Sequence, residues 1–528
     1  MLSSRLRIPL LTLGLALSAG CGSSKDDSAA AATDPLVVTT DKGAVAGTSL
    51  GKTRSFVGIP YAAPPVGPLR WKSPQPAAAW ATPRDAKTLG SQCPQFGLFT
   101  GKWDDDTNED CLTLNVWTPT GATQRPVMVW IHGGGFTAGS GDLSGYDGQK
   151  LSEVGDVVVV TLNYRLGVLG YLAHAALSAE DPAHPGSGNY GIEDQRAALQ
   201  WVKTNIAAFG GDPANVMIFG ESAGAESVFT HMVSPGSAGL FQRALAESGY
   251  LLAMPTLTAA QAQGDKLATQ VGCTDAASVL TCLRALDPQM LSSALFHPAL
   301  GKLDPNWAPV IGTDVLPDNP LASMRAGTVA KVPFIVGTLE NEANLGYAVS
   351  TFPDDKSVHD AFAAMVPADR LDALIAQYPV AAFPTRKDAV EQASTDSAFA
   401  CPSRRVARYA ATAGVPTRLY RFQHAIENAP IAGLGAFHGS EIPFVFGNPY
   451  VESTIRFDVS DDERPLSAAV MGYWTRFATT GDPNGGGGPA WPAYDAAGDM
   501  ALVLDTTIVA QTGLTSGRCD FWDSVQPY

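Results

Sequence analysis

The 528-residue sequence has few charged residues, and the basic ones are outnumbered. Charged residues make up 16% of it, and 35 Lys and Arg stand against 51 Asp and Glu, which gives a formal net charge of −16 at pH 7. Phosphate backbones would repel so acidic a chain. We therefore exclude a general nucleic-acid binder and expect no nucleic-acid partner.

Long hydrophobic runs and metal-ligand patterns are also missing. No run approaches the 18 apolar residues of a membrane-spanning helix, so none is expected. No Cys-x-x-Cys pair or Cys/His cluster has the spacing of a zinc site, and we expect no metal. Hydrophobic residues still make up 45% of the chain, which excludes disorder for most of it and allows a large core.

The first twenty residues have the pattern of an export signal. Arg5 and Arg7 form a positive start, and Ile8–Ala19 is a short apolar stretch, so residues 1–20 are predicted to be a signal peptide. The segment that ends at Cys21 resembles a bacterial lipoprotein signal, although Ser18 stands where such signals usually carry leucine. That resemblance implies lipidation of Cys21 and a periplasmic or cell-surface location. Ordinary cleavage at a small residue, followed by secretion, is the alternative.

The remaining domain organisation follows from composition. Residues 21–34 are small and polar and are predicted to be a flexible tether, and residues 35–528 a single catalytic domain. A membrane contact is expected only through the lipid anchor. The other six cysteines are an even number, which fits disulfides in an exported protein without choosing among the pairings. They are Cys93, Cys111, Cys273, Cys282, Cys401 and Cys519.

Apolar runs of strand length alternate with helical patterns along the chain. Helix-like segments such as Asp194–Ala208 and Ala223–Met232 lie between the runs, and residues 37–62 suggest short antiparallel strands. This alternation predicts an α/β fold, with a mostly parallel, mixed sheet covered by helices on both faces. Ligands of such sheets bind beyond the carboxyl ends of the strands. The strand-like runs are residues 112–117, 127–132, 156–164, 216–220, 332–337 and 417–422.

Two segments match the pattern Gly-x-Ser-x-Gly. The segment around Ser49 lies among turn glycines with no helix after it, which predicts a hairpin loop. The segment around Ser222, Gly-Glu-Ser-Ala-Gly, follows an apolar strand and precedes a helix-forming stretch. That context is typical of a nucleophile elbow, in which the serine projects at a helix N-terminus. We therefore predict Ser222 as the nucleophile.

Three consecutive glycines follow His132 at the end of another predicted strand. Such a run costs backbone entropy, and one reason for it is to aim N–H groups at an oxyanion. The N–H groups of Gly134 and Gly135, together with that of Ala223, are predicted to form a three-donor oxyanion hole.

Serine needs a base and an orienting acid. His438 lies in a glycine-flanked loop after the nucleophile and is the best candidate for the base, whereas His132 belongs to the glycine segment and the other six histidines lie in polar or mixed contexts. Such a base predicts activity that rises with pH through about 6–7. Glu340 and Glu342 both follow the strand at 332–337 directly, and the residues alone leave the choice of the acid between them open.

The sequence as a whole resembles the carboxylesterase type-B family. The resemblance is carried by the two glycine motifs and by EDCLTLNVW, NYRLGVLGY, NYGIEDQRAALQWVKTNIAAFGGDPANV and HGSEIPFVFG. It implies the α/β-hydrolase fold and hydrolysis of small carboxylic esters through an acyl-enzyme, without a cofactor. In that family the acid is a Glu five residues after the strand-end glycine, here Gly337, which indicates Glu342. Ala343 stands where the family usually has glycine.

The resemblance implies further pairings and roles. It implies the disulfides Cys93–Cys111, Cys273–Cys282 and Cys401–Cys519, and the ion pairs Arg70–Glu109 and Arg165–Asp194. Ser248 matches a serine behind the triad, and Trp103 and Phe136 are candidates to line the substrate site. Two alternatives to the esterase are a lipase for longer acyl chains and a non-catalytic surface binding protein of the same fold.

Overall fold

A long mixed sheet runs through the described part of the chain. The computed structural model describes residues 35–182, 184–250, 254–294, 307–452, 455–514 and 516–526. The predicted signal peptide, the tether and Cys21 lie outside these residues, and residues from Leu36 on cluster as one compact unit. The eleven strands, in their order across the sheet, are β16 (Val509–Thr512), β15 (Met500–Leu504), β12 (Thr417–Phe422), β11 (Phe334–Leu339), β10 (Arg243–Glu247), β9 (Gly211–Glu221), β7 (Arg125–Ile131), β8 (Val158–Leu162), β6 (Thr113–Pro119), β4 (Thr53–Pro60) and β3 (Thr48–Ser49).

The middle of this sheet is parallel and its edges are antiparallel. Strands β8, β7, β9, β10, β11, β12 and β15 pair in parallel, whereas β6, β4, β3 and β16 join by antiparallel pairing. The predicted mostly parallel, mixed sheet is therefore confirmed. Because parallel strands end at the same edge, the segments that follow β7, β9 and β11 meet there.

Helices cover both faces of the sheet, as the alternation of side chains requires. Along β7, Val129 and Ile131 belong to one hydrophobic cluster and Met128 and Trp130 to the other. The first cluster includes side chains of α4 (Tyr190–Asn205), α5 (Ala223–Val233) and α13 (Cys401–Thr412). The second includes side chains of α1 (Gln149–Gly155), α14 (Ile442–Phe446) and α15 (Arg464–Thr480). The prediction of helices on both faces is confirmed.

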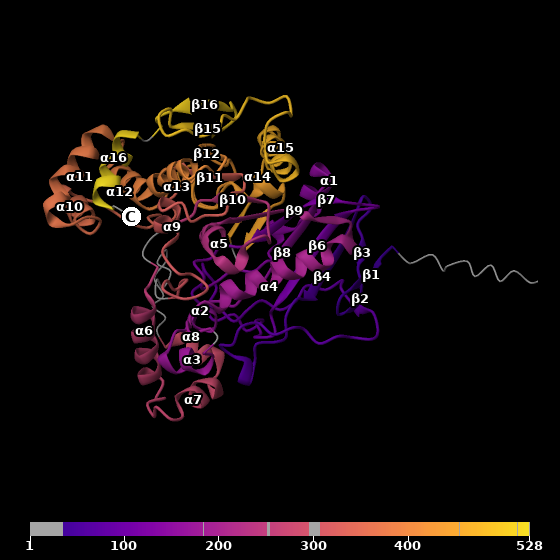
Figure 1. Cartoon of the computed structure of the whole chain (residues 1–528). Helices are drawn as coiled ribbons and strands as arrows, with labels where there is room; N and C mark the ends of the chain where they lie inside the picture. Colours follow the sequence, from indigo (N-terminus) through magenta and orange to yellow (C-terminus); the bar gives the residue numbers. More distant parts are fainter. Residues whose placement is uncertain are drawn as a thin grey trace, which may run out of the picture. The chain divides into compact units, whose positions relative to one another are not determined.

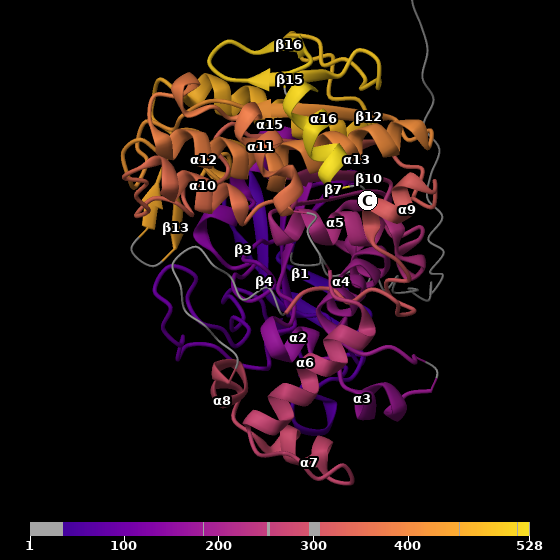
Figure 2. The ribbon, with the colours of Figure 1, turned by 90° about the vertical axis from the view of Figure 1, so that its left-hand side faces the viewer.

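The remaining helices form two groups, which Figures 1 and 2 show at separate places around the sheet. One group packs around the buried Tyr378 and Trp522 and contains α10 (Asp355–Ala363), α11 (Leu371–Gln377), α12 (Arg386–Thr395) and α16 (Ser516–Val525). The other contains α2 (Gly167–Tyr171), α3 (Ala175–Glu180), α6 (Leu257–Gln270), α7 (Val279–Ala285) and α8 (Pro288–Ser293). Helix α9 (Pro320–Arg325) belongs to neither group and packs on α5 and α13. Two small sheets are formed by β1 (Val37–Thr40), β2 (Gly43–Ala46) and β5 (Arg84–Asp85), and by β13 (Tyr450–Glu452) and β14 (Ile455–Phe457).

One central strand was not predicted. Strand β10 has the sequence Arg-Ala-Leu-Ala-Glu, without a β-branched residue, and so lacks the composition typical of a strand. It nevertheless pairs in parallel with β9 on one side and β11 on the other, and its three middle residues are fully buried. Its neighbours in the sheet, rather than its own propensity, make it a strand.

Three disulfides join segments of the described chain. They are Cys93–Cys111, Cys273–Cys282 and Cys401–Cys519, the same pairs that the resemblance implies. In the parts of the chain that the structure describes, no helix has both the length and the apolar character needed to cross a bilayer.

Candidate active site

The turn between β9 and α5 holds Ser222 in an unusual backbone conformation. Its φ is +58° and its ψ is −123°, and its N–H donates a 2.9 Å hydrogen bond to the carbonyl of Glu247 on β10. The turn needs glycine on both sides. A Cβ at Gly220 would lie 2.5 Å from the carbonyl oxygen of Ile131, and one at Gly224 would lie 2.0 Å from it. The strand–turn–helix context predicted for Ser222 is therefore confirmed.

The glycine segment that follows β7 lies against this turn. A Cβ at Gly133 would come within 3.0 Å of the Cβ of Ser222. Gly134 and Gly135 have positive φ angles of +101° and +60°, and neither N–H finds an acceptor among the described residues. Ala223 is the first residue of α5, so its N–H has no partner within the helix. The predicted oxyanion donors thus belong to two segments that meet at Ser222.

His132 stabilises the glycine segment and is unsuited to be the base. Its ring is stacked on Tyr164 with 4.4 Å between the ring centroids, and its Nδ1 lies 2.8 Å from the carbonyl oxygen of Gly133. Burial lowers the pKa of His132 from 6.5 to about 4. The neutral ring donates from Nδ1 to the loop backbone, in keeping with its predicted place in this segment.

The structure brings His438 to Glu342 and not to Glu340. His438 Nδ1 lies 2.7 Å from Glu342 Oε2, and the other oxygen of this buried carboxylate accepts the N–H of Leu339 at 2.8 Å. Glu340 instead accepts hydrogen bonds from Arg421 Nε at 2.8 Å and from Gln423 Nε2 at 2.9 Å. The two carboxylates follow the same strand, but only one faces the imidazole.

The second ring nitrogen of His438 faces Glu221, the residue before the predicted nucleophile. His438 Nε2 lies 3.1 Å from Glu221 Oε1, and within the described residues the Ser222 hydroxyl has no hydrogen-bond partner. Burial alone would lower the pKa of His438, but the carboxylates of Glu221 and Glu342 outweigh it and raise this pKa from 6.5 to about 9. Glu221 lay inside a recognised motif, yet nothing in the sequence indicated this contact.

Further carboxyl groups are buried around the same place. Burial raises the pKa of Glu247 to about 8, although Trp474 Nε1 donates a 2.9 Å hydrogen bond to it. Burial also raises the pKa values of Glu226 and Glu441 well above the usual range. Glu226 also acts on His438, because its carboxylate adds to those of Glu221 and Glu342 in raising the pKa of the imidazole.

An aromatic side chain that the sequence did not indicate packs on His438. Phe399 lies on a single π-helical turn, Asp396–Ala400, between α12 and α13. Its ring centroid is 5.0 Å from that of His438 and 5.3 Å from that of Tyr250. A π-helical turn arises from backbone hydrogen bonding over a longer segment and leaves no local signal in composition.

Two more serines and two aromatic residues that the sequence indicated lie in different surroundings. Ser49 is exposed on the β3–β4 hairpin, so its predicted hairpin context is confirmed. Ser248 is fully buried with a φ of +57°, and its hydroxyl has no partner among the described residues. Phe136 is buried and packs edge-on against Tyr171 rather than standing open to solvent. Trp103 is partly exposed and packs on Phe96 with 5.3 Å between their ring centroids.

Both ion pairs that the resemblance implies are present. Arg70 Nε lies 2.8 Å from Glu109 Oε1, and Arg165 contacts both carboxylate oxygens of Asp194 at 2.7 Å. The second pair is buried, so the attraction between its charges offsets a large desolvation cost.

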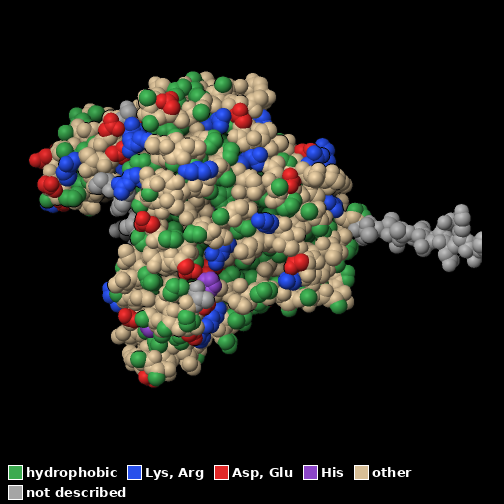
Figure 3. All heavy atoms as spheres, in the orientation of Figure 1, with side chains coloured by type: hydrophobic (Ala, Val, Ile, Leu, Met, Phe, Trp, Pro, Cys, Tyr) green, Lys and Arg blue, Asp and Glu red, His purple; other side chains and the backbone are tan. Residues whose placement is uncertain are grey.

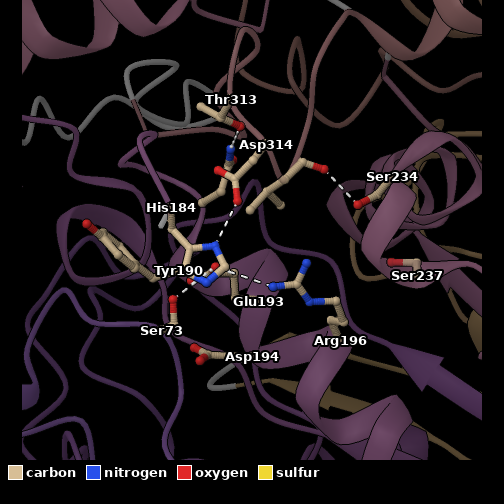
Figure 4. Close-up of polar contacts among 12 residues, drawn as sticks. Ser73, His184, Tyr190, Glu193, Asp194, Arg196, Ser234, Ser237, Thr313 and Asp314 are labelled. Atoms are coloured by element: carbon tan, nitrogen blue, oxygen red, sulfur yellow. Dashed lines mark hydrogen bonds and ion pairs between the residues drawn. The ribbon is translucent and has the colours of Figure 1, made fainter. Parts of the chain in front are cut away.

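A separate, shallow surface pocket lies beside α3 and α4, and its lining contains none of the predicted catalytic residues. Several of its polar side chains are already paired, as Figure 4 shows. Glu193 accepts a 3.1 Å hydrogen bond from Ser73 and lies 3.4 Å from Arg196, and His184 lies 2.9 Å from Asp314.

On the face drawn in Figure 3, acidic and basic side chains are interspersed. Among the described residues, no group of three or more His, Cys, Asp or Glu side chains could hold a metal ion.

Comparison with known proteins finds one family and similar relatives. The model of the carboxylesterase family matches residues 34–522. The para-nitrobenzyl esterase of Bacillus subtilis is 37% identical over 498 residues, covering 90% of this chain and 96% of the relative. Mouse cholinesterase is 35% identical over 535 residues, covering 93% and 86% of the two chains. Dog carboxylesterase 5A is 34% identical over 520 residues, covering 91% and 87%.

Proposed function

Because this chain belongs to the carboxylesterase family and is a carboxylic ester hydrolase, we propose that it cleaves esters through a covalent acyl-enzyme on Ser222. The observation that carries the proposal is the 2.7 Å contact between His438 Nδ1 and the buried carboxylate of Glu342, next to the strained turn that presents Ser222. A nucleophile, a base and an acid that orients the base are the parts that this chemistry requires.

In the proposed acylation step, Ser222 Oγ attacks the ester carbonyl while His438 Nε2 accepts its proton. Glu342 holds the proton on Nδ1, so that Nε2 of the neutral ring is free to act as the base. Because Nε2 faces Glu221 in the present geometry, the ring has to turn toward Ser222 as substrate binds. The negative charge on the carbonyl oxygen is bound by the N–H groups of Gly134, Gly135 and Ala223.

The same groups complete the reaction. The protonated His438 gives its proton to the leaving alcohol, whose departure leaves the acyl group on Ser222. His438 then takes a proton from water as that water attacks the acyl-enzyme, which forms a second oxyanion in the same hole. Collapse of this intermediate breaks the bond to Ser222 Oγ, which takes the proton back from His438, and the carboxylic acid leaves. Every proton and charge in this cycle is handled by side chains and backbone groups of the chain itself.

Small, soluble esters are the proposed substrates. The name of the Bacillus relative makes para-nitrobenzyl esters a first choice, beside para-nitrophenyl esters of increasing chain length. We expect turnover of short-chain esters below their solubility limit. Turnover only above that limit would favour the lipase alternative, and no turnover of any ester would favour a non-catalytic binding protein.

The test of the mechanism is the substitution Ser222→Ala, compared with Ser49→Ala in the other Gly-x-Ser-x-Gly segment. Ser222→Ala should lower kcat by on the order of 10⁴-fold or more, because only the oxyanion hole and binding remain. Ser49→Ala should leave kcat unchanged, since Ser49 is exposed on a hairpin. More than a tenth of the activity left in Ser222→Ala would refute the assignment.

We further propose that the protein is exported and held at a membrane by a lipid on Cys21, with residues 21–34 as the tether of one catalytic domain, residues 35–528. Three disulfides in the described chain support export, because they persist in oxidising compartments. The test is fractionation of the wild type and Cys21→Ser. Membrane-bound wild type and soluble Cys21→Ser are expected, and a mature wild-type chain lacking Cys21 would refute lipidation but not export.

A further inference from the structure

Among the described residues, no strand pairs with the segment that carries the predicted oxyanion donors. Residues 133–139 leave β7 and turn back on themselves, with the N–H groups of Thr137 and Ala138 bonded to the carbonyl of Gly134. The end of this turn is Gly139, whose φ is +102°. A Cβ at Gly139 would lie 2.6 Å from both the carbonyl oxygen of Gly133 and the Nδ1 of His132. Gly139 is therefore packed closely against Gly133 and His132, and a larger residue there would displace the glycine segment.

The side chain of Gln95 holds both backbone polar groups of Gly139. The N–H of Gly139 donates to Gln95 Oε1 at 2.7 Å, and Gln95 Nε2 donates to the carbonyl of Gly139 at 3.0 Å. This paired arrangement is the one that a neighbouring strand would otherwise supply. Gln95 is only 5% exposed, so water cannot readily replace these two hydrogen bonds.

Gln95 is in turn anchored to the Cys93–Cys111 disulfide. Its Nε2 donates a second hydrogen bond, of 3.0 Å, to the carbonyl of Cys93 two residues earlier. Cys93 and Cys111 are both buried, and the disulfide ties the segment of Gln95 to the start of β6. Three hydrogen bonds therefore fix the side-chain amide of Gln95. Its Nε2 donates two of them, and its Oε1 accepts the third.

We propose that Gln95 is a positioning residue for the oxyanion hole, and that the Cys93–Cys111 disulfide supports the reaction through it. Gln95 touches neither the substrate nor Ser222 in this proposal. It holds Gly139 so that the N–H groups of Gly134 and Gly135 are aimed before the oxyanion forms. The proposal rests on the proposed function, because it presumes that these two groups bind the oxyanion.

The defining test is Gln95→Met, which keeps the length of the side chain and removes all three hydrogen bonds. Removal of an oxyanion-hole donor costs about 10²–10³-fold in kcat. A hole that is misaligned but present should cost less, and we expect kcat to fall by about 10- to 100-fold while KM changes by less than about threefold. Gln75→Met is the matched control, because Gln75 is exposed and, within the described residues, its side-chain amide bonds only to the carbonyl of Ser73.

A second measurement separates positioning from simple loosening of the fold. A trifluoromethyl ketone forms a tetrahedral oxyanion adduct with the nucleophile, whereas the matching methyl carbinol occupies the site without an oxyanion. Gln95→Met should weaken the trifluoromethyl ketone in proportion to its loss of kcat and leave the carbinol affinity unchanged. Equal weakening of both ligands, or a rise in KM alone, would overturn the proposal.

The role of the disulfide is tested by C93S/C111S, with C273S/C282S as the control disulfide. We expect a fall in kcat for the first pair only, and no further fall when Gln95→Met is added to it, because both changes release the same hydrogen bonds. Additive losses would refute the link between the disulfide and Gln95. If C93S/C111S does not fold, Gln95→Met alone decides the positioning role.

The results for Gln95→Met and Ser222→Ala distinguish a failure of the role of Gln95 from a failure of the serine mechanism. Wild-type kcat in Gln95→Met, together with loss of activity in Ser222→Ala, would refute the role of Gln95 and leave the serine mechanism standing. Activity that survives in Ser222→Ala would instead remove the oxyanion hole at Ser222 and the role of Gln95 with it.

Discussion

His438 lies between two carboxylates, and each determines a different property of the ring. Glu342 binds Nδ1 and is fully buried, while Glu221 faces the nitrogen that has to act as the base. The first therefore sets the tautomer and orientation of the imidazole. The second mainly sets how readily the ring loses its proton.

At the scale of single residues, we predict that Glu342→Gln lowers kcat by about 10²–10⁴-fold, because an amide neither fixes the tautomer nor stabilises the imidazolium. Glu340→Gln should cost less than about tenfold, since its carboxylate contacts Arg421 and Gln423 instead. Both variants are measured with the same ester after their fold is checked by circular dichroism. The reverse ranking would move the acid to Glu340, and two small losses would place it elsewhere in the chain.

A second residue-scale prediction concerns pH. The base has to be neutral, so kcat/KM of the wild type should rise with pH through about 9, the raised pKa of His438, rather than through the 6–7 expected from sequence. Glu221→Gln removes one of the charges that raise this pKa, so the midpoint should move to lower pH. The pH dependence of kcat/KM from pH 5 to 10, measured with the same ester, gives both midpoints. An unchanged midpoint in Glu221→Gln would mean that Glu221 does not raise the pKa of His438 in the free enzyme.

The same raised pKa has a consequence for stability. The ordinary, unfolded-state pKa of a histidine is about 6.5. Because the folded state holds the His438 proton more tightly, its contribution to stability is complete below pH 6.5 and is lost as the pH rises through about 9. Wild type should therefore lose more of its free energy of unfolding between pH 7 and 9 than His438→Gln, which has no proton to lose.

At the scale of elements, the contact between α5 and the end of β7 depends on one glycine. A Cβ at Gly224 would lie 2.0 Å from a backbone carbonyl oxygen, which no side-chain movement can relieve. Gly224→Ala should therefore push the helix off the sheet, with a loss of stability of at least about 1–3 kcal/mol and a displaced Ser222. Thermal unfolding and kcat should both fall.

The matched control for this element is Gly517→Ala. Gly517 is also the second residue of its helix, α16, but a Cβ there meets nothing within 4 Å. Alanine is the better helix former, so the melting temperature should be unchanged or slightly raised. Equal effects of the two substitutions would show that helix propensity, rather than the contact with β7, explains the result.

At the scale of the whole molecule, the Cys401–Cys519 disulfide joins α13, which packs on the sheet, to α16 near the end of the described chain. It spans 118 residues, against 9 for Cys273–Cys282. The loop-closure model gives about 5 kcal/mol for the longer loop and about 3 kcal/mol for the shorter one. We predict that C401S/C519S lowers the midpoint of denaturant unfolding more than C273S/C282S does.

Ion pairs also connect α13 with α16. Arg405 and Arg408 of α13 contact the two carboxylate oxygens of Asp523 in α16 at 2.7 Å. They should keep α16 in place after the disulfide is removed, and high salt should weaken them. The destabilisation of C401S/C519S is therefore expected to grow with ionic strength. No difference between the two disulfide variants at any salt concentration would contradict the prediction that the disulfide and these ion pairs together hold α16 on α13.

The sequence by itself determined the elements whose signals are local. Apolar runs identified β7, β8, β9 and β11, because a strand buried on both faces is mostly apolar. The nucleophile elbow was recognisable because a positive φ at Ser222 and close approach on both sides demand small residues at fixed spacing. The family resemblance added the choice of Glu342, which spacing along the chain could not make.

Only the tertiary structure decided what depends on contacts between distant segments. It made a strand of β10, placed Glu221 on His438 and put Phe399 over the same ring. It also set the direction of the pKa shift of His438, because burial and nearby carboxylates act in opposite senses and their balance depends on distance. Two hydrogen bonds join Gln95 to Gly139, which lies 44 positions later in the chain, and no periodicity or motif predicts such a contact.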